Sequence, residues 1–137
     1  MRVDAGIARL AAGVPFSNEI CMVGATEGTT DPMKKMVVVK HGRTTGLTAA
    51  PIKTVGLEAL VDDPDTGREL SFVDLFLVEP DGASSQLALP GDSGSLVVDG
   101  ESRKAVGLLH AADPGGTFYY AQSIKAVLKE LEIDLLP

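Results

Sequence analysis

Short apolar runs separated by turn-forming residues recur along most of this chain. The run at 36–40 is β-branched, and the runs at 70–78 and 105–110 are followed within a few residues by Pro or Gly. Apolar runs of this length with turn signals between them are typical of strands joined by hairpins. The strands predicted in this way span residues 19–24, 36–40, 49–61, 70–78, 96–98, 105–110 and 117–121.

The pattern changes to a helical period only near the end of the chain. Four apolar residues follow at helical spacing after Ser123, which is a good N-cap. They are Ile124, Val127, Leu128 and Leu131. We therefore expect a helix over about 123–132. The whole pattern predicts a single all-β domain, 1–137, built as an antiparallel six-stranded β-barrel with a C-terminal α-helix.

Charge and composition exclude several classes of function. The formal net charge is −7 and there is no basic cluster, so no nucleic acid is expected as a partner. No apolar run reaches membrane-spanning length, so no membrane is expected either. Residues 1–20 do not resemble a signal peptide, which predicts a cytoplasmic protein if Met1 is the true start.

No metal and no cofactor are expected. One cysteine, Cys21, and two histidines cannot make a zinc site. The acidic residues at 62–67 lack the spacing of a calcium loop, and their Pro-Asp-Thr-Gly composition predicts a hairpin turn instead. Cys21 lies inside an apolar run, so we expect it to be a buried, unreactive side chain.

The strongest candidate for chemistry is the Gly-Asp-Ser-Gly sequence at 91–94, just before the apolar run at 96–98. Glycine on each side allows a tight turn that exposes the serine hydroxyl among free backbone N–H groups. Acyl transfer needs such a hydroxyl, together with donors for the oxygen that becomes negative. An ordinary turn between two strands is the alternative interpretation.

This sequence resembles the nucleophile loop of the chymotrypsin-like (trypsin-fold) serine proteases. By that resemblance Ser93 is the nucleophile, and the amides of Gly91 and Ser93 form the oxyanion hole. Asp4, followed by the apolar segment 5–8, is similar to the aspartate segment of the family's catalytic triad. The alternative is that Asp4 is a solvated residue at the end of the chain.

A second stretch carries the same resemblance far from the serine. Gly-Arg-Thr-Thr-Gly at 42–46 is similar to a second-barrel hairpin of the bacterial, α-lytic and streptogrisin type. The resemblance implies that the predicted barrel is the second barrel of that fold, the C-terminal half of a peptidase domain. It also implies that His41, beside this hairpin, lies on the surface away from the serine.

The family's triad follows the order His, Asp, Ser, and only three residues precede Asp4. We therefore expect the Ser- and Asp-bearing half of a trypsin-like serine endopeptidase, inactive alone because serine without a base is a poor nucleophile. The alternative is a non-catalytic peptide-binding or assembly module. An α/β-hydrolase using Ser93, Asp99 and His110 is excluded, since position 95 is serine and no helix follows Ser93.

The resemblance also implies a substrate pocket. Leu87 and Ala88 fall where basic-specific relatives carry an acid, so no preference for Lys or Arg before the scissile bond is expected. His110 and Ala111 lie on the strand that lines the cleft, where some glutamate-specific relatives place a histidine. Three orientations of His110 stay open: toward the pocket, toward Asp4 or into the core. A role as the catalytic base is the least favoured of its interpretations.

A peptide or protein is expected as the substrate. In the two-barrel fold the barrels pack on each other, so a second barrel by itself exposes an apolar face. We expect this face to bind another copy of the chain, giving a homo-oligomer, or a separate first barrel that carries the histidine.

Overall fold

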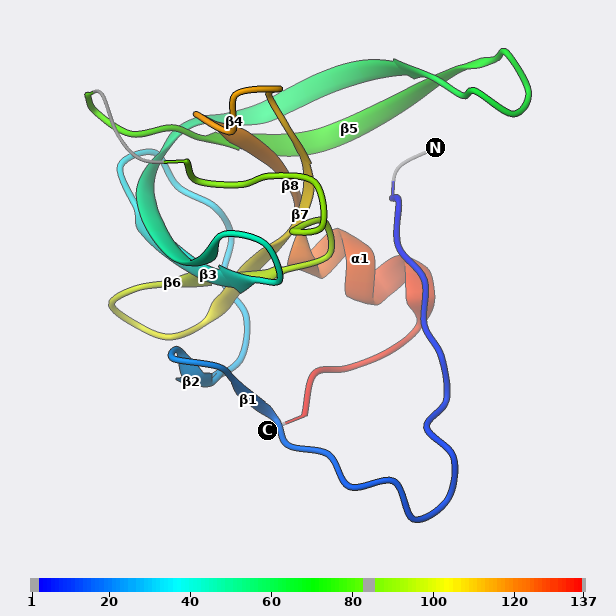
Figure 1. Cartoon of the computed structure of the whole chain (residues 1–137), viewed down its shortest axis with the longest axis vertical. Coiled ribbons are helices and arrows are strands. Elements are labelled where there is room, and N and C mark those ends of the chain that lie inside the picture. The colour runs from blue at the N-terminus through cyan, green and yellow to red at the C-terminus, as the bar shows by residue number, and fades with distance from the viewer. Residues whose placement is uncertain (1–2, 83–85, 137) are drawn as a thin grey trace.

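Six strands form a closed antiparallel barrel. The computed structural model describes residues 3–82 and 86–136. The barrel strands are β3 (Val37–Gly42), β4 (Gly46–Asp62), β5 (Glu69–Val78), β6 (Leu96–Asp99), β7 (Ala105–Ala112) and β8 (Tyr119–Ser123). They follow one another around the barrel in the order β3–β4–β5–β8–β7–β6, and pairing of β3 with β6 closes the ring (Figure 1). The predicted all-β barrel is confirmed.

The barrel interior is filled by alternate residues of its strands, because successive side chains of a strand face opposite sides. Apolar residues from all six strands meet there. They are Val38, Ala50, Ile52, Phe76, Val78, Val97, Val106, Leu109, Tyr119 and Ala121, joined by Leu87 and Ala88 from the loop before β6. Lys40 and Asp92 are charged, yet neither has any exposed surface. These two buried charges determine the geometry of the candidate site described below.

A single helix, α1 (Ile124–Leu131), follows β8 directly and packs on the outside of the barrel (Figure 1). The predicted helix is confirmed, although Ser123 makes no side-chain capping hydrogen bond. Ile124 and Val127 are buried in a second apolar cluster together with Val3 and Ala105. This cluster fixes both the helix and the beginning of the chain against β7.

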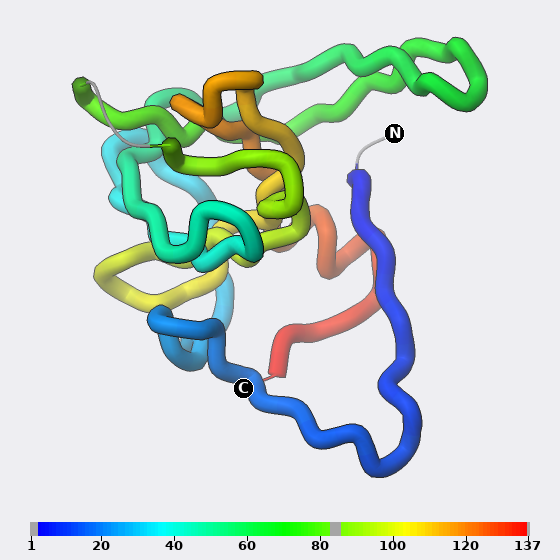
Figure 2. Tube along the Cα trace, viewed as in Figure 1, coloured from blue at the N-terminus to red at the C-terminus, as the bar shows by residue number. Residues whose placement is uncertain are grey.

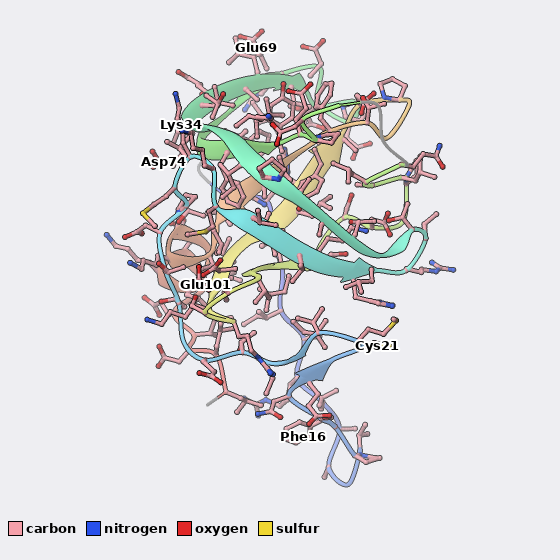
Figure 3. The ribbon with its side chains drawn as sticks, turned by 90° about the vertical axis from the view of Figure 1, so that its left-hand side faces the viewer. Phe16, Cys21, Lys34, Glu69, Asp74 and Glu101 are labelled. Carbon is pink, nitrogen blue, oxygen red and sulfur yellow. The ribbon has the colours of Figure 1, made fainter. Side chains whose placement is uncertain are left out.

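From Val3 the chain runs past α1 without regular structure until it forms a small hairpin (Figure 2). The hairpin consists of β1 (Glu19–Ile20) and β2 (Gly24–Ala25), joined by a turn in which Met22 has a φ of 62°. The prediction of one strand over 19–24 with a buried cysteine was wrong. Cys21 lies on the turn, and its free thiol is exposed (Figure 3). Strand pairing takes up only two residues on each side of the turn, so the apolar run is not buried.

The hairpin of β4 and β5 extends well beyond the barrel as a two-stranded arm (Figures 1 and 2). Strand β4 is continuous through Gly56, but this residue has a φ of 70° and the β4–β5 register shifts between Thr54 and Leu57 and again between Leu57 and Ala59. At the tip, Asp63 accepts hydrogen bonds from the amide of Asp65 and the hydroxyl of Thr66. The predicted hairpin turn at 62–67 is therefore confirmed.

Within the described ranges, 3–82 and 86–136, no helix is long and apolar enough to cross a bilayer. In the same ranges no three His, Cys, Asp or Glu side chains come together in a group that could hold a metal ion.

Candidate active site

Ser93 is exposed on the tight loop that connects the buried segment at Leu87 and Ala88 to the start of β6. Gly91 and Gly94 both have positive φ, 102° and 85°, which side chains with a Cβ rarely adopt. The amide of Asp92 donates to the carbonyl of Leu89 at 3.0 Å and closes the first turn of the loop. The two glycines thus give the loop the conformation that the Gly-Asp-Ser-Gly sequence predicts.

The buried Asp92 carboxylate fixes this loop through hydrogen bonds on its inner side. It accepts hydrogen bonds from the amides of Leu89 (2.9 Å), Thr44 (2.8 Å) and Thr45 (3.2 Å), and from the Thr45 hydroxyl (2.7 Å). Burial alone would raise the pKa of Asp92, but these hydrogen bonds outweigh it and lower the pKa to about 2. A Cβ on Gly42 would lie 2.2 Å from Asp92 Oδ1, so glycine is needed there to admit the carboxylate.

Lys40 supplies the positive charge beneath the loop. Its Nζ lies 3.8 Å from Asp92 Oδ2, and neither side chain is exposed. The ammonium also donates to the carbonyl of Gly46 at 3.0 Å and to the hydroxyl of Thr45. Burial lowers the pKa of Lys40, and the negative charge of Asp92 partly offsets this effect. The pair is therefore fully enclosed and well supplied with hydrogen bonds.

The Gly-Arg-Thr-Thr-Gly hairpin at 42–46 lies directly against the serine loop. Besides the bonds to Asp92, the Thr44 hydroxyl donates to the carbonyl of Pro90 at 2.7 Å. The hairpin thus supports the serine loop directly. Contacts between segments nearly fifty residues apart leave no periodic signal in the sequence, so this packing was not predicted. His41 is half-buried on β3, and its ring makes no hydrogen bond to Ser93.

The four consecutive backbone amides of residues 91–94 differ in whether they already donate a hydrogen bond within the protein. Those of Asp92 and Gly94 donate to backbone carbonyls, the latter to Leu109 at 2.8 Å. No hydrogen bond from the amides of Gly91 or Ser93 is found among the described residues. These are the two donors expected to form an oxyanion hole.

Asp4 is fixed by its backbone. Its amide donates to Gln122 Oε1 at 2.6 Å, and its carbonyl accepts from Gln122 Nε2 at 2.8 Å. Gln122 is buried on β8, and Val3 next to Asp4 belongs to the apolar cluster under α1. The Asp4 side chain is 66% exposed, so its carboxylate is solvated while its backbone is held by these two hydrogen bonds.

His110 points toward Asp4. His110 lies between the paired residues Leu109 and Ala111, where the β7–β8 register shifts. Its backbone carbonyl faces Ser93, whereas its ring faces Asp4. The ring is only 8% exposed, its Nδ1 lies 3.5 Å from Asp4 Oδ2, and its centroid is 4.6 Å from that of Phe72. Burial lowers the pKa of His110, and the Asp4 charge partly opposes this.

Ser93 meets the same residue from the other side. Its Oγ lies 3.5 Å from the carbonyl oxygen of His110, at the limit of a hydrogen bond. The structure therefore brings Ser93 and Asp4 to opposite ends of one residue of β7. The His110 ring does not hydrogen-bond to the serine hydroxyl, and its Nδ1 has no hydrogen-bond partner among the described residues.

A cavity of about 330 Å³ opens beside Ser93. His110 and Ala111, both predicted at a substrate pocket, line it. Leu87 and Ala88 do not line this cavity, because both are buried in the barrel core. The remaining lining residues are Leu89, Pro90, Leu109, Ala112, Asp113 and Pro114.

Sequence reasoning missed the residues that hold the site together. Lys40 carried a usable signal, since its position in the alternating strand β3 is an inward one. Thr44 and Thr45 were noticed only as part of a hairpin. Gln122 carried no signal, because its contact with Asp4 joins the two ends of the chain.

Solved structures of several proteases share this architecture. Cellulomonas bogoriensis chymotrypsin matches with a TM-score of 0.71 over 93% of this chain and 66% of that chain, at 21% identity. The fold is that of the chymotrypsin-like serine proteases. Thermobifida fusca protease A matches with a TM-score of 0.64 over 82% of this chain and 54% of that chain, at 19% identity. The expected resemblance to bacterial chymotrypsin-like enzymes is thus confirmed for the fold.

A glutamic acid specific serine protease, described as using a novel histidine triad in substrate binding, has the same chymotrypsin-like fold. It matches with a TM-score of 0.62 at 15% identity, over 81% of this chain and 54% of that chain. This chain thus spans about half to two thirds of the length of these proteases. No protein-family model and no curated protein matches the sequence.

Proposed function

We propose that the chain supplies the serine and the aspartate of a trypsin-like serine endopeptidase. Ser93 is the nucleophile, Asp4 orients the histidine that takes the serine proton, and the Gly91 and Ser93 amides hold the oxyanion. One observation carries the proposal: Ser93 and the Asp4 carboxylate, far apart in sequence, both lie within 3.5 Å of the single residue His110. The chymotrypsin-like fold supports it.

The reaction needs a base that the described residues do not place at the serine. In acyl transfer the base removes the Ser93 proton as Oγ attacks the peptide carbonyl, and then gives that proton to the leaving amine. Neither histidine ring hydrogen-bonds to Ser93 Oγ. The proposal therefore assigns the base to a histidine on a separate first barrel, with a peptide or protein as substrate.

The experiment measures covalent labelling of Ser93 by a fluorophosphonate, with the modified residue located by mass spectrometry. We expect the isolated chain to react very slowly. A His-bearing first barrel, fused or added in trans, is expected to raise the rate by at least about 100-fold, in line with the loss that follows removal of a triad member. Ser93→Ala abolishes this labelling. The matched control is Ser95→Ala, since Ser95 is half-buried, donates to the Asp92 carbonyl and is no nucleophile here.

Two results would overturn the proposal. The first is a folded complex with the first barrel that leaves Ser93 unlabelled. The second is rapid labelling of the isolated chain that disappears in His110→Ala, because that result would make His110 the base.

The surface around the beginning of the chain supports the proposed partner. Large apolar side chains are exposed there, including Ile7, Leu10 and Phe16, of which Phe16 projects from the lower tip in Figure 3. Exposed apolar surface of this kind favours association. Light scattering at micromolar concentration tests this part of the proposal. It is contradicted if the chain is monomeric when alone and also forms no complex when a first barrel is added.

A non-catalytic peptide-binding module is the second candidate, and the cavity beside Ser93 is the observation that favours it. In that case peptides shift the backbone NMR signals of residues 109–114 in the isolated chain, and no first barrel makes Ser93 reactive. Labelling of Ser93 in the complemented site contradicts this candidate.

A further inference from the structure

His110 has a buried nitrogen that the mechanism above does not use. Its Nδ1 has no hydrogen-bond partner among the described residues, although it lies 3.5 Å from a carboxylate oxygen of Asp4. A buried nitrogen is rarely left without a partner, because desolvation without a hydrogen bond is unfavourable. A small movement of the exposed Asp4 side chain is enough to satisfy it.

We propose that His110 is a positioning residue that clamps the Asp4 carboxylate and that its protonation in acid tightens this clamp into an ion pair. The consequence for activity rests on the function proposed above. Neutral His110 donates one hydrogen bond from Nδ1 and leaves Asp4 its negative charge. Protonated His110 neutralises that charge, so Asp4 stabilises the imidazolium of a catalytic histidine less well.

The surroundings of His110 leave Asp4 as the charge that acts on it. The beginning of the chain presents Asp4, β5 presents the Phe72 ring, and the serine loop presents the neutral Ser93. On β8 the residues in register with its neighbours are Tyr120 and Ala121. Asp113 lines the same cavity, but three hydrogen bonds hold its carboxylate on the amides of Gly115 and Phe118 and the hydroxyl of Thr117.

The fold keeps the two partners together. Asp4 is attached to β8 through both hydrogen bonds of Gln122, and His110 is enclosed against Phe72. The carboxylate can therefore turn about its own side-chain bonds while its backbone stays next to the imidazole. This arrangement makes the contact depend on protonation rather than on chain movement.

The test uses the full chain labelled with ¹⁵N-histidine, and His41→Gln identifies the two rings. At neutral pH we expect His110 to be uncharged with its proton on Nδ1. In Asp4→Asn the acid midpoint of His110 falls by about half to one pH unit, the size expected for one partly exposed charge at this distance. Asp31→Asn removes an equal charge from a surface pair with Lys125 and leaves the midpoint unchanged. An unchanged midpoint in Asp4→Asn, or an unprotonated Nδ1 at neutral pH, overturns the proposal.

A second measurement follows Ser93 labelling against pH in the site completed by a first barrel. His110→Gln keeps an amide that can donate to Asp4 but does not titrate. We expect the pH profile of this variant to lack the acid step of His110 and to keep the acid step of the catalytic histidine, whatever its labelling rate at neutral pH. A His110→Gln profile that keeps both acid steps of the parent contradicts the proposed switch. Absence of labelling in every protein refutes the proposed endopeptidase instead, and the NMR result still decides the clamp.

Discussion

Lys40→Met tests whether the buried ion pair supports the serine loop. Methionine fills most of the volume of lysine but carries no charge, so the Asp92 carboxylate is left enclosed without its cation. The Lys40 bonds to the Thr45 hydroxyl and the Gly46 carbonyl are lost as well. The four hydrogen bonds that Asp92 accepts remain in place.

The expected loss follows from these contacts. A unit-charge pair at 3.8 Å interacts by about 4 kcal/mol at an effective dielectric constant of about 20. Breaking a buried pair by removing one partner generally lowers the free energy of unfolding by about 3–5 kcal/mol. Since Asp92 keeps its hydrogen bonds, we expect about 3 kcal/mol, which corresponds to a fall in Tm of about 10 °C or slightly more for a domain of this size.

Urea unfolding followed by circular dichroism measures this loss, because the chain has no tryptophan. Lys53→Met is the matched control: Lys53 pairs with Asp81 on the surface, where 33% and 81% of the two side chains are exposed. It should change the free energy of unfolding by less than about 1 kcal/mol. In the double variant Lys40→Met/Asp92→Asn, the loss in free energy of unfolding should be smaller than the summed losses of the two single variants by at least about 1 kcal/mol. Strict additivity would refute the reasoning.

Three further outcomes are expected. The pKa of Asp92 is lowered from 3.8 to about 2, which adds about 2 kcal/mol to the free energy of unfolding. This contribution is present above pH 4 and is lost as pH falls toward 2, so the acid unfolding curve of Asp92→Asn should lack this step. Gly42→Ala places a Cβ against the fixed Asp92 carboxylate and should lower the free energy of unfolding by about 2–3 kcal/mol, whereas Gly6→Ala, with open space around it, should have little effect in the same urea titration. Cys21 should react with a thiol reagent in the native protein as fast as in urea, and protection in the native state contradicts its exposed position.

The elements of this fold could be predicted where a local period marks them. The β-branched run of β3, the apolar run of β5 and the helical spacing after Ser123 each reflect one buried face, which is a property of neighbouring residues. The Gly-Asp-Ser-Gly loop could be recognised for a similar reason, since both of its glycines are required by backbone conformation.

The parts that could not be predicted depend on contacts between distant residues. Cys21 lies in an apolar run that resembles a strand, yet pairing partners exist only at the two ends of that run. The support of Asp92 by Lys40 and Thr45 joins segments whose separation no pattern reveals. Gln122 is polar and lies next to the helix start, so nothing marks it as the attachment of Asp4.

The attachment of Asp4 to Gln122 also fixes the order in which the site can form. These residues are separated by 118 positions, and the ring itself closes only when β3 meets β6. Contacts of such long range form late and make folding slow. During synthesis the serine loop leaves the ribosome before β8 does, so a nascent chain carries Ser93 while Asp4 still lacks both hydrogen bonds to Gln122. An incompletely synthesised or partly folded chain therefore presents its serine without the aspartate, and the two come together only once the last barrel strand is in place.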